Sequence, residues 1–133
     1  MDTRTIEGDN HRLEWVGGLV RGAIWKRPDL DNAQGAVNAR QIEATLVEWL
    51  RHRPHGLFLD VSEGPEVAGP KTEETIGSWF EAYARAKVPI AVQVGSSAVQ
   101  KMQYQRLLQE KAGGLGKLCT NAPEALAFLA RPG

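Results

Sequence analysis

The chain has 133 residues, 42% of them hydrophobic and 24% charged, which is the composition of one globular domain with its own core. Its 16 basic and 16 acidic side chains cancel, which argues against a nucleic-acid binder and against a binder of anionic membranes. Cys119 is the only cysteine, so no internal disulfide can form. The N-terminus is polar and no apolar run approaches the ~20 residues of a spanning helix, so we expect a cytoplasmic protein without membrane insertion.

Short apolar runs alternate with amphipathic stretches along the rest of the chain. Residues 1–10 are expected to form a flexible N-terminus, and residues 11–133 one domain. The expected elements begin with strands at 11–16 and 19–25, joined as a hairpin at Gly17-Gly18, and a helix at 33–52 that Asp31 or Asn32 caps and Pro54 ends. They continue with a strand at 57–61, a helix capped by Thr72, a strand at 88–94, a helix at 97–112, a strand at 115–120 and a helix capped by Asn121. This β-β-α-β-α-β-α-β-α order predicts an α/β fold with a mixed, mostly parallel sheet.

The spacing of apolar residues predicts which helix faces are buried. Trp49 and Trp79 fall at core positions of their helices. In the helix at 97–112, Val99 and Met102 are expected in apolar contacts. The glutamines of this helix are expected to face solvent: Gln100, Gln103, Gln105 and Gln109.

Polar residues follow the predicted parallel strands, at the edge where open α/β sheets usually bind ligands. They are Asp60, Ser62 and Glu63, then Gly95, Ser96 and Ser97, then Cys119, Thr120 and Asn121. An enzyme would need a nucleophile with a base beside it, yet His52 and His55 precede the central strand and belong at the opposite end.

A structural explanation is available for each of these residues, and the sequence favours it. Cys119 has the character of a small buried side chain, and Asp60 and Glu63 can satisfy their own loop. The turn at 95–97 suits a helix cap better than an anion site. The histidines lack a third metal ligand. The sequence therefore indicates no catalytic, cofactor-binding or metal-binding residue.

Three segments are similar, in order and spacing, to segments of the STAS domain, the fold of anti-anti-sigma factors and sulphate-transporter tails. Residues 57–62 (Leu-Phe-Leu-Asp-Val-Ser) resemble its central strand, 98–102 its third helix, and 120–129 its closing strand-to-helix element. The resemblance covers residues 11–131 and is nearest to divergent SpoIIAA-like bacterial proteins. It implies the α/β fold described above and a role in signalling.

One departure from this family lies at the helix start after the central strand. Anti-anti-sigma factors carry Asp-Ser-Ser-Gly there, and a kinase phosphorylates a serine of that motif. This chain reads Ala-Gly-Pro-Lys-Thr over residues 68–72. The family's phosphoserine switch is therefore not implied here, and Thr72 is expected to act as the helix N-cap.

The resemblance favours a non-enzymatic regulatory module that binds another protein. Its expected contact surface comprises Asp60, Ser62, Glu63, Glu66, Lys71, Thr72, Ser96 and Ser97. Two alternatives stay open: a carrier of a lipid or nucleotide, as in some STAS-like relatives, and a small enzyme using Cys119 or the Asp60/Glu63 pair. A homodimer through an exposed hairpin edge carrying Trp15 and Trp25 is a further expectation.

Overall fold

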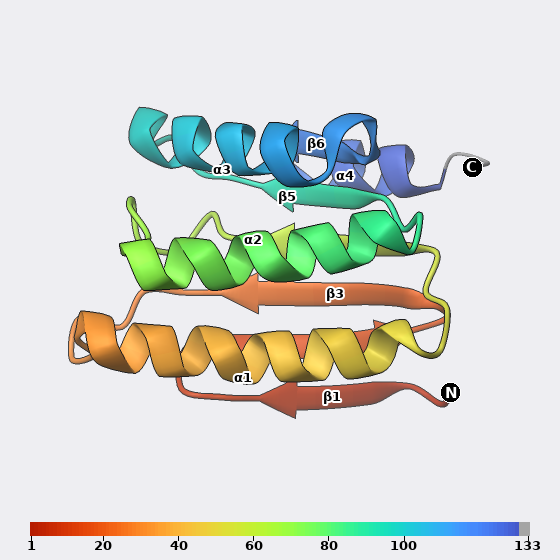
Figure 1. Cartoon of the computed structure of the whole chain (residues 1–133), viewed down its shortest axis with the longest axis horizontal. Helices are drawn as coiled ribbons and strands as arrows, with labels where there is room; N and C mark the ends of the chain where they lie inside the picture. The colour runs from red at the N-terminus through yellow and green to blue at the C-terminus, as the bar shows by residue number, and fades with distance from the viewer. Residues whose placement is uncertain (131–133) are drawn as a thin grey trace.

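A six-stranded sheet in the order β1-β2-β3-β4-β5-β6 forms the centre of the computed structural model, which describes residues 1–130 (Figure 1). The elements are β1 (Arg4–Glu7), β2 (His11–Val16), β3 (Leu19–Ile24), α1 (Asn32–Leu50), β4 (Gly56–Asp60), α2 (Pro70–Arg85), β5 (Ile90–Gln93), α3 (Ala98–Lys111), a 3₁₀ turn (Gly113–Leu115), β6 (Gly116–Cys119) and α4 (Ala122–Leu129). The first three strands pair antiparallel, and β3 to β6 pair in parallel. The predicted mixed α/β fold is thereby confirmed.

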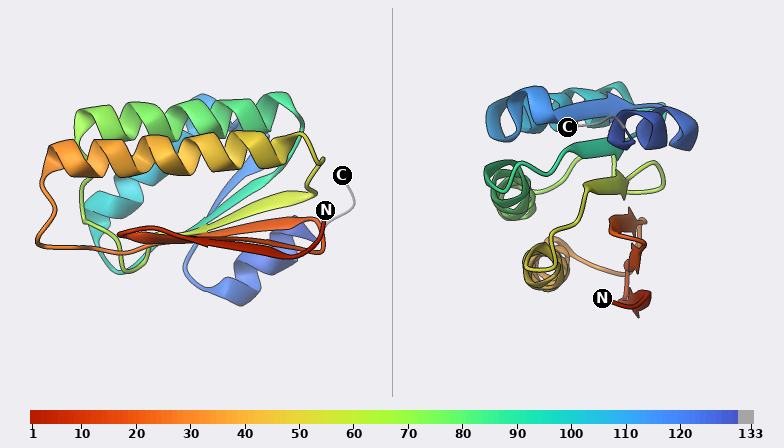
Figure 2. Two further views of the ribbon diagram at one scale, coloured as in Figure 1. Left: turned by 90° about the horizontal axis from the view of Figure 1, so that it is seen from below. Right: turned by 90° about the vertical axis from the view of Figure 1, so that its right-hand side faces the viewer.

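The helices form two unequal layers on the sheet. Helices α1, α2 and α3 cover one face, and α4 packs on the other (Figure 2). The main core lies under the three helices, where Trp79, Phe80 and Tyr83 are fully buried. The hydroxyl of Tyr83 donates a hydrogen bond to the carbonyl oxygen of Leu46 at 2.6 Å, which ties α2 to α1. A smaller core under α4 contains Cys119.

The N-terminus is not the flexible segment that the sequence suggested, because Arg4–Glu7 form strand β1 and pair with β2. All four residues of β1 are exposed, so no apolar alternation marked the strand. This pairing also removes the expected hairpin edge. Trp15 is 4% exposed and its ring packs edge-on to that of Trp49, with centroids 6.4 Å apart. The expected route to a homodimer is therefore wrong, while dimerisation itself stays a prediction.

The start of α2 also differs from the expectation. The helix begins at Pro70, its N-cap is Gly69, and no side chain caps it. Proline suits this first position because it lacks an N–H group and its φ angle is already helical. Thr72 is therefore the third helical residue and not the N-cap. The caps expected at the other helices are confirmed, since Asp31, Ser97 and Asn121 each accept a hydrogen bond from the backbone N–H three residues ahead.

The first turns of helix α3 present a different face to the protein than their apolar residues suggested, whereas Leu107 and Leu108 in its later turns are buried. Val99 and Met102 are 52% and 72% exposed, whereas Gln100 is only 2% exposed. The prediction was wrong for Gln100, and also for Gln103, which is half-buried. Both glutamines face the loop that joins β4 to α2.

Within residues 1–130, no helix is long and apolar enough to cross a membrane.

Candidate functional site

One end of the sheet gathers the carboxyl ends of the parallel strands and the first turns of three helices. Helices α1, α2 and α3 all begin at the end towards which β3 and β5 point (Figure 1). The loop of residues 61–69, which joins β4 to α2, crosses this end, and we call it the β4–α2 loop. The sequence analysis placed the functional edge here on the topology of the sheet.

The buried side chain of Gln100 fixes the β4–α2 loop to α3 through hydrogen bonds. The amide nitrogen of Gln100 donates to the carbonyl oxygens of Val61 at 2.7 Å and Pro65 at 3.2 Å. Its amide oxygen accepts from the backbone N–H of Gly95 at 2.9 Å. One side chain thus joins the start of the loop, the middle of the loop and the turn after β5.

Gln103, one turn further along α3, holds the other half of the loop. Its amide oxygen accepts from the N–H of Ala68 at 2.9 Å, and its amide nitrogen donates to the carbonyl of the same residue at 3.1 Å. This pair of hydrogen bonds is the one that a neighbouring strand would offer to an extended backbone. The two glutamines were missed at the sequence level. The signal that could have found them is their i, i+3 spacing on a helix that begins at this edge.

Five of the eight residues expected at the contact surface border one depression at this end. Ser62, Glu63 and Glu66 come from the loop, and Ser96 and Ser97 from the turn before α3. Lys71 and Thr72 lie apart from these five, beside the first turns of α1.

Asp60 does not belong to that surface. Its Oδ1 atom accepts hydrogen bonds from the backbone N–H of Ser62 at 2.9 Å and from the Ser62 hydroxyl at 2.6 Å. Asp60 borders a depression that also includes Arg21 and Phe58, whereas Glu63 borders the depression described above. The carboxyl of Asp60 therefore satisfies its own turn, as the structural explanation predicted.

Cys119 is fully buried in the small core beneath α4, and burial raises the pKa of its thiol to about 11. Thiolate is the nucleophilic form, so the side chain is poorly suited to attack a substrate. The ring of His52 packs edge-on to that of Trp15 at 6.1 Å. Across the described residues, no cluster of three His, Cys, Asp or Glu side chains could hold a metal ion.

The turn at 95–97 acts as the start of α3. The N–H of Gly95 is taken by Gln100, and the hydroxyl of Ser97 caps α3 by accepting from the N–H of Gln100 at 3.2 Å. The helix cap expected at this turn is therefore confirmed.

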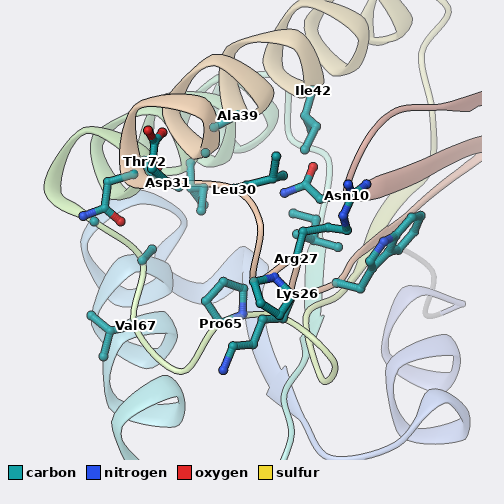
Figure 3. A pocket seen from close by; sticks show the side chains of 18 of the residues that line it. Asn10, Lys26, Arg27, Leu30, Asp31, Ala39, Ile42, Pro65, Val67 and Thr72 are labelled. Atoms are coloured by element: carbon teal, nitrogen blue, oxygen red, sulfur yellow. The ribbon is translucent and has the colours of Figure 1, made fainter.

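A pocket of about 330 Å³ opens beside the β4–α2 loop, between the first turns of α1 and α2 and the end of β3. Its volume lies at the lower end of the roughly 300–1,000 Å³ found for sites of small ligands. Lys26 and Pro65 lie together on one side of it, across from Asp31 and Thr72 (Figure 3). Arg27, also at this pocket, forms two hydrogen bonds with the carboxylate of Asp29. No feature of the sequence pointed to this pocket.

No family model matches the chain, and no curated protein does so either. Its structure is similar to the NMR structure of the protein TM1081. The TM-score is 0.60 and the sequence identity 14%, over 99% of this chain and 100% of that chain. At this identity the similarity shows the fold alone, so the function has to be argued from the site.

Proposed function

We propose that this protein is a non-enzymatic, STAS-like regulatory module that binds another protein through the outer side of the β4–α2 loop and the adjoining turn before α3. The observation that carries the proposal is the attachment of this loop to α3 by Gln100 and Gln103. Loops on rigid scaffolds are where binding residues concentrate in proteins.

The attachment matters because it lowers the cost of binding. Ordering a mobile side chain or loop at an interface costs roughly 0.5–1.5 kcal/mol per immobilised side chain, and a loop that is already fixed avoids much of the backbone part of this cost. Burial of Gln100 also brings a polar amide into the interior, which apolar packing alone would not require. The loop geometry is therefore maintained by dedicated polar contacts.

The surface presented by the fixed loop combines charge with a small apolar contact. Glu63, Glu66 and Val67 are exposed on the loop, Val67 to 57%, and Lys71 is exposed on the first turn of α2. A partner with a basic group and a small apolar recess would complement this surface.

A capture experiment tests the proposal. The whole chain is used as bait in a lysate of the source cell, beside the double variant Glu66→Ala/Lys71→Ala. The matched control is Glu81→Ala/Arg85→Ala, which also removes one acid and one base from exposed or half-exposed positions of α2, but at its other end. We expect a partner that the wild type and the control retain and the first variant loses. A partner that all three proteins retain equally, or no partner at all, would contradict the proposal.

A second candidate function, the binding of a small molecule, is favoured by the pocket beside the loop.

A further inference from the structure

The pocket between α1 and α2 has a volume of about 330 Å³, which suits a small ligand. Apolar side chains from four parts of the chain form much of its wall: Ile24, Leu30, Ala39, Ile42 and Ile76. A site of this kind, apolar with a few polar groups, is the usual form of a small-molecule site.

One buried aromatic residue of the wall carries a polar group without a partner. Trp79 on α2 is fully buried, and its indole N–H has no hydrogen-bond acceptor. Buried polar groups are nearly always paired in native proteins, so this orphan at the pocket points to a ligand that supplies an acceptor. The hydroxyl of Tyr104 on α3, also at the pocket, makes no hydrogen bond within the described chain and is open to a ligand.

The mouth of the pocket adds further donors. No side chain caps the start of α2, and Thr72 in its first turn borders the pocket, so unpaired backbone N–H groups lie at this side. Arg27 is engaged by Asp29, and Asp31 is engaged in capping α1. Lys26 is exposed and has no ion-pair partner among residues 1–130. The groups left for a ligand on the Lys26 side and at the start of α2 are therefore donors, with the positive charge of Lys26, while Asp31 keeps one free carboxylate oxygen on the other side of the pocket.

We propose that this pocket binds a small apolar carboxylic acid. The hydrocarbon part lies against the aliphatic wall, and the carboxylate lies towards Lys26 and the start of α2. The inner donor, the indole N–H of Trp79, favours a ligand that carries an acceptor oxygen and disfavours one that brings only donors. This inference goes beyond the proposed partner surface. Trp79 and Tyr104 line the pocket and not the outer depression, whereas Lys26 borders both.

Nuclear magnetic resonance of the indole N–H groups tests the proposal directly. The chain has four tryptophans, so four indole signals are expected, and Trp79→Phe identifies one of them. The whole chain, without any partner, is titrated with octanoate, with the neutral acceptor 2-octanone and with octylammonium. We expect octanoate to move the Trp79 signal saturably, 2-octanone to bind roughly tenfold more weakly, and octylammonium to produce no saturable shift.

Variants locate the two recognition elements. Lys26→Met should weaken octanoate binding about tenfold and leave 2-octanone binding unchanged, whereas Lys87→Met, at an exposed site beyond the end of α2, should change neither. Tyr104→Phe keeps the ring and should weaken both ligands about fivefold. A Trp79 signal that moves with none of the three compounds overturns the proposal. Equal affinity for octanoate and octylammonium, or an unaffected Lys26→Met variant, overturns the assignment to an acid.

The same titration on Glu66→Ala/Lys71→Ala separates this inference from the proposed function. Neither side chain lines this pocket. We therefore expect octanoate affinity within twofold of wild type in that variant, even where partner capture is lost. A variant that loses octanoate binding as well would contradict a pocket site independent of the partner surface.

Discussion

The role of Gln100 can be tested by replacing it with methionine, which has a similar length and volume but no amide group. The variant removes three hydrogen bonds, to Val61, Pro65 and Gly95. If Gln100 fixes the β4–α2 loop, Gln100→Met should destabilise the fold and loosen the loop. An exposed glutamine on the same helix, Gln109, gives the matched control Gln109→Met.

The three lost bonds are not equal. Val61 keeps one hydrogen bond, because its carbonyl also accepts from the N–H of Gly64 at 2.8 Å. The loss of its bond to Gln100 therefore costs about 1 kcal/mol. The half-buried N–H of Gly95 loses its only acceptor at a cost of about 1 kcal/mol. Pro65 is exposed, and water can replace its partner. The expected destabilisation is therefore about 2 kcal/mol, while Gln109→Met should stay within about 0.5 kcal/mol of wild type.

Urea unfolding followed by circular dichroism measures the difference. With an m-value of about 2 kcal/mol/M, Gln100→Met should lower the midpoint by about 1 M without changing m. Hydrogen exchange should show faster exchange at Gly95 and Gly64, whose amides lie at the positions that Gln100 holds. Equal midpoints for Gln100→Met and Gln109→Met would refute the reasoning.

Three further outcomes follow from the caps and the buried titratable groups. Thr72→Ala should cost less than about 0.5 kcal/mol in urea unfolding, because Thr72 does not cap α2, whereas Asn121→Ala should cost about 1 kcal/mol, and the reverse order would contradict the observed helix starts. Cys119 should resist iodoacetamide at pH 8 in the folded chain and react in denaturant, since burial raises its pKa to about 11; rapid labelling of the folded chain would show that the thiol is accessible. Burial lowers the pKa of His11, so its neutral ring is favoured in the folded state, and this contribution to stability is full above pH 6.5 and decreases as pH falls below that value. His11→Gln should reduce the loss of stability below pH 6.5, and the exposed control His55→Gln should leave more of that loss in place. The same dependence of unfolding free energy on pH in both variants would argue against His11.

The elements predicted best are those whose local signals agree with their tertiary surroundings. The hairpin between β2 and β3 followed from Gly17-Gly18, and both residues have positive φ angles, as a tight hairpin turn requires. Pro54 and the cap at Asp31 set the limits of α1 to within two residues at either end. Topology alone also predicted that the candidate residues after β4 and β5 would lie at one end of the sheet, since parallel strands place their carboxyl ends together.

The predictions that failed concern residues whose role is set by distant parts of the chain. Arg4–Glu7 form a strand through backbone bonds to β2, which require no particular side chains. Gln100 and Gln103 are polar and so were assigned to solvent, yet the loop residues that they bind lie 35 to 39 residues earlier in the chain. Hydrophobic periodicity carries no information about such pairings.

The pocket was unpredictable for a related reason, because its wall combines residues spread from Asn10 to Tyr104 that no local pattern connects. The β4–α2 loop nevertheless joins the pocket to the proposed partner surface. Pro65, Val67 and Ala68 line the pocket, whereas Glu63 and Glu66 border the outer depression. Because Gln103 fixes Ala68 and Gln100 fixes Pro65, a ligand that shifts either residue must strain or relieve these bonds. The two binding events would then be coupled through one loop, and thermodynamic linkage requires that a ligand alter partner affinity by the same factor as the partner alters ligand affinity.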